Sequence, residues 1–123
     1  MARKKPKSRV CCPAKPKLEE RPLLDGEHAG ELMGVFKVLA NDTRLRLLHV
    51  LVREGELCVG DLADALDMKS QAVSNQLQRL ADRGILGAKR NGNRIHYRIV
   101  DPCVPILLDQ GLCLMEDAKE RAK

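Results

Sequence analysis

The sequence predicts one mainly helical domain that carries a small β-hairpin, an α+β arrangement. Three observations predict it. Apolar residues recur at three- and four-residue spacing over most of the chain. They alternate at a spacing of two between residues 94 and 99, as in a half-buried strand. A length of 123 residues is enough for one core, and the 32% charged and 44% hydrophobic residues are typical of a globular chain.

The N-terminal segment differs in composition from the rest of the chain. Residues 1–17 hold seven basic residues, three prolines and no acidic residue, and a linker with room for one short helix follows up to Gly26. Such a segment cannot bury enough apolar surface to fold alone. We therefore expect a flexible basic arm and linker over residues 1–26, a folded domain over residues 27–118 and a disordered tail over residues 119–123.

Four helices are expected before the hairpin. The first begins near Glu27, and the second follows the interruption at residues 41–43 and ends at Gly55. Its dense apolar residues predict a buried central helix. Two shorter helices follow over about 58–66 and 70–83, separated by a break at residues 67–69. Opposite an apolar stripe, the second short helix presents a polar, amide-rich face, which is typical of a helix-turn-helix.

A hairpin and a last helix complete the predicted fold. Residues 86–100 alternate apolar and basic side chains, and Asn91–Gly92 supplies the positive backbone angles of a tight turn. A basic hairpin after a helix-turn-helix is a wing, so the fold is a winged helix-turn-helix. The last helix runs from Asp101 to about Ala118. Because little else covers the apolar first and last helices, we expect a homodimer.

The charge distribution indicates double-stranded DNA as the partner. Residues 69–98 hold seven basic residues against Asp82 alone, on a body that is otherwise slightly acidic. With one Phe, one Tyr and no Trp, base-stacking recognition of single strands is nearly excluded. A solvated helix face is the alternative for the charge alone. The candidates for base contacts are Ser70, Gln71, Ser74, Asn75 and Gln78. The candidates for phosphate contacts are Thr43, Arg44, Lys69, Arg79, Lys89, Arg90 and Arg94.

Other classes of protein find no support in the sequence. No apolar run approaches the roughly 20 residues of a membrane span, and no segment resembles a secretory signal. We expect a cytoplasmic protein without a membrane partner. The three histidines are scattered, and no phosphate-binding glycine loop or Ser/His/Asp arrangement is present. We therefore expect no enzymatic activity and no cofactor required for folding.

The five cysteines predict a site for a soft ion, because free thiols or metal ligands are more common than disulfides in such a chain. The adjacent Cys11 and Cys12 are poorly placed for an unstrained disulfide, but both can meet one large ion. Cys58, at the start of a helix, is the natural third ligand. Thiolates select Hg(II), As(III), Cd(II) or Pb(II). The simplest alternative for Cys58 is a small buried hydrophobe.

Several motifs resemble, in the right order, those of the ArsR/SmtB family of winged-helix, metal-sensing repressors. Residues 36–48 (FKVLANDTRLRLL) resemble its signature, and residues 56–62 (ELCVGDL) its metal box. That box carries a second cysteine in cadmium and lead sensors, where this chain has Gly60. Residues 70–77 (SQAVSNQL) resemble the recognition helix, with Asn75–Gln76 in place of a His-His pair. Residues 84–86 and 94–98 resemble parts of the wing, and the match spans about residues 30–117.

The resemblance implies a dimeric repressor of a heavy-metal resistance operon, which an inducing ion releases from a palindromic operator. It also implies an inducer site at Cys58, joined by cysteines of the arm. The zinc sensors of the family carry another site in the last helix. Its first half corresponds to Asp101 and Cys103, and Cys113 with Glu116 or Asp117 could substitute for the second half. Since Cys103 and Cys113 lie about 80° apart around the helix, we expect them to share an ion only across a dimer, or else to be core residues of that dimer.

The number of sulfur ligands ranks the inducing ions. Mercury is satisfied by two or three sulfurs and ranks first. Arsenite or antimonite, which take three thiolates, ranks next. Cadmium and lead follow closely, because a fourth thiol is missing at Gly60. Two alternatives remain open. One is a repressor on the same fold that responds to thiol oxidation or persulfides, and the other is a small thiol enzyme or metal-buffering protein.

Overall fold

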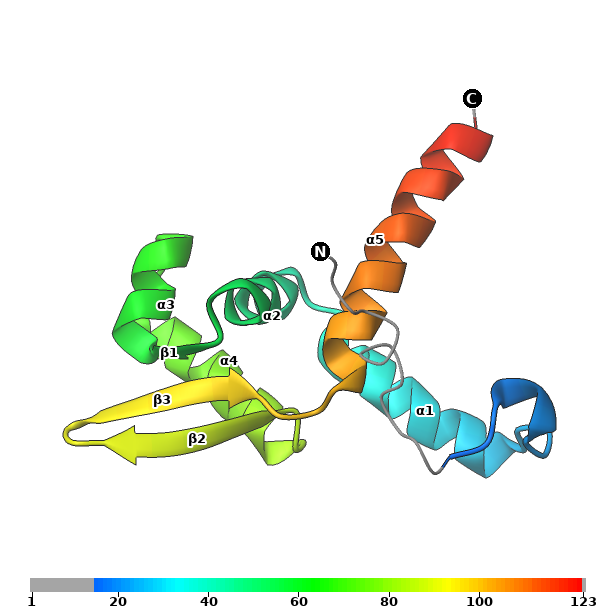
Figure 1. Cartoon of the computed structure of the whole chain (residues 1–123), viewed down its shortest axis with the longest axis horizontal. Helices are drawn as coiled ribbons and strands as arrows, with labels where there is room; N and C mark the ends of the chain where they lie inside the picture. Colours follow the sequence, from blue (N-terminus) through cyan, green and yellow to red (C-terminus); the bar gives the residue numbers. More distant parts are fainter. Residues whose placement is uncertain (1–14, 123) are drawn as a thin grey trace, which may run out of the picture. The chain divides into compact units, whose positions relative to one another are not determined.

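The computed structural model describes residues 15–122 and divides the chain into two compact units between Asn41 and Asp42 (Figure 1). The cysteines predicted in the arm, Cys11 and Cys12, lie outside the described residues. The division falls within residues 27–118, the range expected for the folded domain, at the start of the second predicted helix. Within residues 15–122, no helix combines the length and the apolar character that crossing a bilayer requires.

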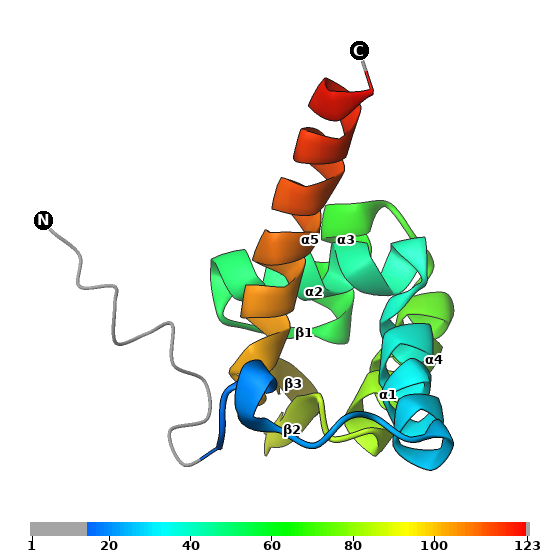
Figure 2. The same cartoon turned by 90° about the vertical axis from the view of Figure 1, so that its right-hand side faces the viewer.

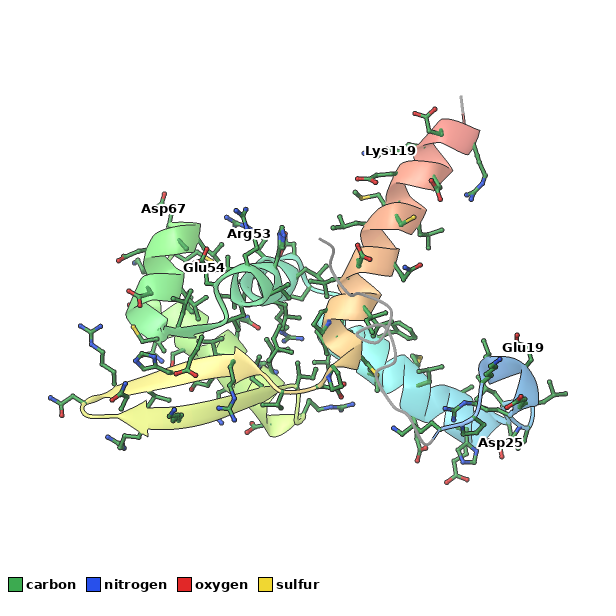
Figure 3. All side chains as sticks on the ribbon, in the orientation of Figure 1. Glu19, Asp25, Arg53, Glu54, Asp67 and Lys119 are labelled. Atoms are coloured by element: carbon green, nitrogen blue, oxygen red, sulfur yellow. The ribbon has the colours of Figure 1, made fainter. Side chains whose placement is uncertain are left out.

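The first unit contains a short 3-10 helix and one long α-helix. The 3-10 helix η2 (Leu18–Glu20) lies in the expected linker, and α1 (Gly26–Leu39) follows. Asp25, labelled in Figure 3, precedes α1. It caps this helix, since its Oδ1 accepts a 2.8 Å hydrogen bond from the backbone N–H of His28. This bond and a second one from the His28 ring lower the pKa of Asp25. Apolar side chains of α1 remain exposed in the single chain, namely Leu32, Met33, Val35 and Phe36.

The second unit is built on three helices around a leucine-rich core. These are α2 (Asp42–Glu54), α3 (Val59–Leu66) and α4 (Ser70–Asp82). Glycines with positive φ follow two of them, with φ of 92° at Gly55, where the sequence predicts the end of the second helix, and 79° at Gly84. The helix α2 is less buried than expected, since Leu45 and Val52 are exposed and only one side faces the core. The fully buried side chains are Leu47, Leu48, Leu51, Leu62, Val73, Leu77 and Leu80.

A three-stranded antiparallel sheet replaces the predicted two-stranded hairpin. Its order is β1 (Glu56–Cys58), β3 (Arg94–Ile99) and β2 (Leu86–Asn91). The strand β1 was not predicted, because three residues are too few to show alternation and their pairing partner is distant in sequence. The turn also lies one residue later than predicted. Asn91 pairs with Arg94, so Gly92 and Asn93 form the loop, and Gly92 alone has a positive φ of 69°.

The last helix, α5 (Cys103–Arg121), packs on α2 near its N-terminal end, where Val104 is buried. Asp101, just before this end, accepts a 2.8 Å hydrogen bond from the backbone N–H of Cys103. The C-terminal half of α5 projects away from the rest of its unit and exposes Leu112, Leu114 and Met115 (Figures 1 and 2). The helix includes residues 119–121, which we expected in a disordered tail. Basic residues in its last turn stabilise that end of the helix dipole.

Candidate DNA-binding surface and thiol site

The polar face predicted for the second short helix is the exposed face of α4. Ser70, Gln71, Asn75 and Gln78 are exposed on it, whereas the apolar stripe opposite faces the core. A hydrogen bond of 3.1 Å from Gln71 Nε2 to Asn75 Oδ1 joins two candidate base contacts. The helix thus presents an ordered row of amides and hydroxyls that can meet base edges. Among the remaining candidates, Ser74 is half-buried, and Lys69 and Arg79 are exposed.

Two candidates at the start of α2 are half-buried, and one of them is engaged within the protein. The Nε of Arg44 donates a 2.7 Å hydrogen bond to Oε1 of Gln76 on α4. Arg44 therefore links α2 to the recognition helix, in addition to any contact with phosphate. Thr43 lies beside Asp42, with 3.5 Å between the hydroxyl and the carboxylate. Gln76 was not among the predicted residues, although its place in the recognition motif could have indicated it.

The hairpin β2–β3, which we call the wing, carries the predicted basic residues. Lys89 and Arg90 are exposed on β2, and Arg94 is exposed at the start of β3. Exposed cations on a protruding hairpin are well placed to meet DNA phosphates. The side chain of Arg94 also reaches back to α3, where its Nη1 lies 3.7 Å from the sulfur of Cys58.

Cys58 lies where β1 ends and α3 begins, as the N-cap residue of that helix. Cys58 is only 5% exposed, as expected if it were simply a small buried hydrophobic residue and not a ligand. The thiol nevertheless has polar partners. It donates a hydrogen bond of 3.3 Å to Oδ2 of Asp61 and accepts the one from Arg94. The contact with Asp61 could have been predicted from sequence, because Asp61 lies three residues after Cys58 in the first turn of the same helix. Nothing in the sequence indicates the contact with Arg94.

An open pocket of about 510 Å³ borders the thiol. It is formed between the first turns of α3 and the tip of the wing. Gly60 lies in its wall, and a Cβ built there meets no atom within 4 Å. An ion can therefore reach Cys58 through this pocket. The lining residues are Cys58, Val59, Gly60, Asp61, Asp64, Asn93, Arg94 and Ile95.

The cysteines of α5 have different surroundings. Cys103 is half-buried at the first turn, whereas Cys113 is exposed two to three turns later. The Sγ of Cys113 lies 3.7 Å from Oδ2 of Asp117. The negative charge of Asp117 raises the pKa of the Cys113 thiol, so this thiol holds its proton more tightly than a free cysteine.

No complete ion site is formed within the part of the chain that the structure describes. Among residues 15–122, no group of three or more His, Cys, Asp or Glu side chains is positioned to hold a metal ion. The four residues of the candidate second site, Asp101, Cys103, Cys113 and Asp117, therefore do not gather in one chain. The potential ligands that the structure describes are single thiols, with Cys58 beside a pocket and Cys113 facing solvent. Such thiols fit a soft ion that takes its other sulfur ligands from the arm or from a second chain.

A two-helix unit with an exposed polar second helix, followed by a basic wing, defines a winged helix-turn-helix DNA-binding protein. Comparison with known proteins agrees. A family described as a helix-turn-helix domain matches residues 39–86. The arsenic resistance transcriptional regulator ArsR1 of Pseudomonas putida is 40% identical over 98 residues, which are 77% of this chain and 76% of that protein.

Two solved structures show the same fold. The crystal structure of AntR, an antimony-specific transcriptional repressor, is 65% identical with a TM-score of 0.74, covering 89% of this chain and 98% of that one. The solution structure of a homodimeric winged helix-turn-helix DNA-binding domain from Mycobacterium bovis is 32% identical with a TM-score of 0.67, covering 80% and 93%. The chain belongs to the ArsR/SmtB family of winged-helix transcriptional regulators. It is a DNA-binding regulator and not an enzyme.

Proposed function

We propose that this protein is a homodimeric repressor of a metalloid-resistance operon, released from a palindromic operator when a trivalent arsenic or antimony species binds its cysteine thiolates. The observation that carries the proposal is the position of Cys58. Its sulfur lies at the start of the helix-turn-helix, beside an open pocket and in contact with the wing. A ligand of this thiol therefore lies against the first helix of the helix-turn-helix and against Arg94 of the wing.

The choice of ion rests on chemistry and on the relatives together. Trivalent arsenic and antimony take three thiolates, the number that Cys58 would form with Cys11 and Cys12. The similarity to an arsenic resistance regulator and to an antimony-specific repressor supports this class of ion. Ranking mercury first among the inducing ions rested only on the small number of sulfur ligands that it needs. The names of the relatives do not support that ranking.

The ligands proposed for the main site are Cys58 with Cys11 and Cys12 of the arm. Cys103 and Cys113 are the ligands of a proposed second site. There, one cysteine of each subunit would bind the same ion across the dimer. Cys58 of the main site is buried, whereas Cys113 of the second site is exposed and has a raised pKa. An ion that binds at the second site would need to displace the proton that Asp117 helps to retain.

A dimer is supported by the apolar surface that the single chain leaves uncovered. Phe36 and Met33 on α1 and Leu114 and Met115 on α5 are each about half exposed or more. Large apolar side chains exposed in this number are typical of an interface between proteins. The homodimeric state of the related domain from Mycobacterium bovis supports the same assembly. Two recognition helices related by a two-fold axis would read the two halves of a palindrome.

Release requires that the ion bind the DNA-free form more tightly than the DNA-bound form. A difference of roughly 1–3 kcal/mol in ion binding changes operator affinity by about 5–150-fold. An ion at Cys58 that also binds Cys11 and Cys12 of the arm can supply such a difference. It adds bonds between the arm and the start of α3, and it alters the contact between Cys58 and Arg94 of the wing.

The test is operator release by a panel of ions. Fluorescence anisotropy of a labelled operator would follow the purified protein titrated with antimonite, arsenite, Hg(II), Cd(II), Pb(II) and Zn(II), in the presence of a reductant. We expect antimonite and arsenite to release the operator at lower concentrations than the divalent ions. Release by peroxide alone, with all ions chelated, would instead support the redox-responsive alternative. Equal release by every ion, or by none, would contradict the proposal.

A further inference from the structure

The tip of the wing is tied to the start of α3 through one sulfur atom. Arg94 is the first residue of β3, directly after the loop formed by Gly92 and Asn93. Its Nη1 lies 3.7 Å from Cys58 Sγ, and the same sulfur lies 3.3 Å from Oδ2 of Asp61. The hairpin tip and the first turn of α3 are thus bridged by a guanidinium, a thiol and a carboxylate in series.

We propose that Arg94 is a positioning residue that transmits the state of Cys58 to the wing. In the ion-free protein, its bond to the sulfur holds the tip of the wing against α3, in the arrangement that binds DNA. This inference rests on the proposed function, since it names how an ion at Cys58 weakens the grip on the operator. It assigns Arg94 a role beyond the phosphate contact expected from its charge.

The chemistry of ion binding explains why the bridge breaks. When antimonite binds, the S–H bond of Cys58 and one Sb–OH bond are broken, a bond between sulfur and antimony forms, and the thiol proton and the hydroxide leave as water. The carboxylate of Asp61 is the first acceptor of that proton, since the thiol already donates to it. The antimony then occupies the space beside the sulfur, and its size and remaining ligands displace the guanidinium of Arg94, whose Nη1 lies 3.7 Å from that sulfur in the ion-free protein.

The pairing of the strands makes the proposed role specific to Arg94. Arg94 pairs with Asn91, and Arg90 pairs with Ile95, so the two arginines project from opposite faces of the wing. Cys58 pairs with His96, two residues after Arg94 and therefore on the same face as Arg94. Both arginines carry the same charge near the same tip, but only Arg94 faces the thiol. Arg90 is thus a matched control for the loss of charge.

The experiment compares Arg94→Gln with Arg90→Gln. For each full-length variant, operator affinity is measured by anisotropy without ion and with saturating antimonite, and the ratio of the two affinities is the release factor. Both variants should bind the ion-free operator more weakly than the native protein, because each loses a cation. The release factor of Arg90→Gln should match the native value. That of Arg94→Gln should be smaller by roughly threefold or more, the share expected of one hydrogen bond.

A second readout does not depend on DNA. Hydrogen exchange of the backbone amides at residues 91–95 should be faster in ion-free Arg94→Gln than in the native protein, and antimonite should accelerate it in the native protein only. Equal release factors in the two variants, with exchange unchanged, would overturn the role of Arg94.

A third measurement separates that failure from a failure of the proposed function. Sulfur-to-antimony absorption should appear in the native protein and in both arginine variants, and it should decrease in Cys58→Ser. If Cys58→Ser retains the full signal and is released normally, the ion does not bind at Cys58, and both the thiol site and this inference are wrong.

Discussion

Arg44 on α2 and Gln76 on the recognition helix α4 are joined by a 2.7 Å hydrogen bond in half-buried surroundings. The bond ties the start of one helix to the middle of another, so it fixes where α4 lies in its unit. A charged donor in such surroundings contributes about 1.5–3 kcal/mol. Its removal should therefore weaken both the fold and the position of the DNA-reading side chains.

We expect Gln76→Ala to lower the free energy of unfolding by about 1–2 kcal/mol. Urea denaturation followed by circular dichroism would measure the loss. Arg46→Ala, which removes an exposed arginine of α2, the helix of Arg44, should change the free energy of unfolding by less than about 0.5 kcal/mol. Equal effects of the two substitutions would mean that the bond between Arg44 and Gln76 does not hold α4 in place.

Base contacts and phosphate contacts should respond differently to substitution. Asn75→Ala, on the exposed face of α4, should cost about 1–3 kcal/mol on the native operator and relax the preference at one base position. Lys89→Ala, on the wing, should weaken binding to all sequences and reduce the slope of log affinity against log salt by about 1. Binding titrations on operator and scrambled DNA at several salt concentrations would separate the two. An unchanged salt slope in Lys89→Ala would remove that residue from the DNA contacts.

Gly60→Cys should change which ions the protein prefers. The position lies in the first turn of α3 beside the pocket, and a Cβ there meets open space, so the thiol fits without strain. It restores the second cysteine of the cadmium and lead sensors and provides a fourth sulfur. We expect tighter Cd(II) and Pb(II) binding, measured by sulfur-to-metal absorption in competition with a chelator. Gly60→Ser is the control for size, and an identical gain in that variant would show that sulfur is not the cause.

Asp117→Asn should make Cys113 more reactive. Because the carboxylate of Asp117 raises the pKa of this thiol, removing its charge should lower the pKa and increase the thiolate fraction at a given pH. The alkylation rate of Cys113 by iodoacetamide, followed by mass spectrometry, should therefore rise at a lower pH than in the native protein. Glu120→Gln removes one carboxylate from the same helix and should leave the profile nearly unchanged. If both variants show the native profile, Asp117 does not control this thiol.

The helical fold could be predicted from sequence because its signals are local. The apolar stripe of α4, and the glycines at 55 and 84, each depend on residues within a few positions of one another. The strand β1 could not be predicted in this way, since its three residues become a strand only by pairing with Arg98, Tyr97 and His96. The end of α5 was placed too early, because a polar helix that contacts little has no apolar pattern to mark its end.

The candidate site was predictable to a similar extent. The exposed face of α4 follows from helical spacing alone, and Cys58 was indicated by its motif. The partners of Cys58 illustrate the limit. Arg94 is 36 residues away, and the sequence assigned it to DNA because of its charge, whereas the fold turns it toward the sulfur. Contacts of this kind arise from strand pairing and helix packing, which residue spacing does not encode.

The most direct test of thiol-dependent release compares three proteins that differ in which cysteines they retain. Each protein, bound to the operator, is titrated with antimonite, and its release from the DNA is measured. These are the native chain, a variant with Cys11, Cys12 and Cys58 replaced by serine, and a variant with Cys103 and Cys113 replaced by serine. With ion-free affinity confirmed for each, we predict that the first variant stays bound to the operator at antimonite concentrations that release the native protein and the second variant. If the first variant dissociates at the native antimonite concentration, the site at Cys58 is contradicted.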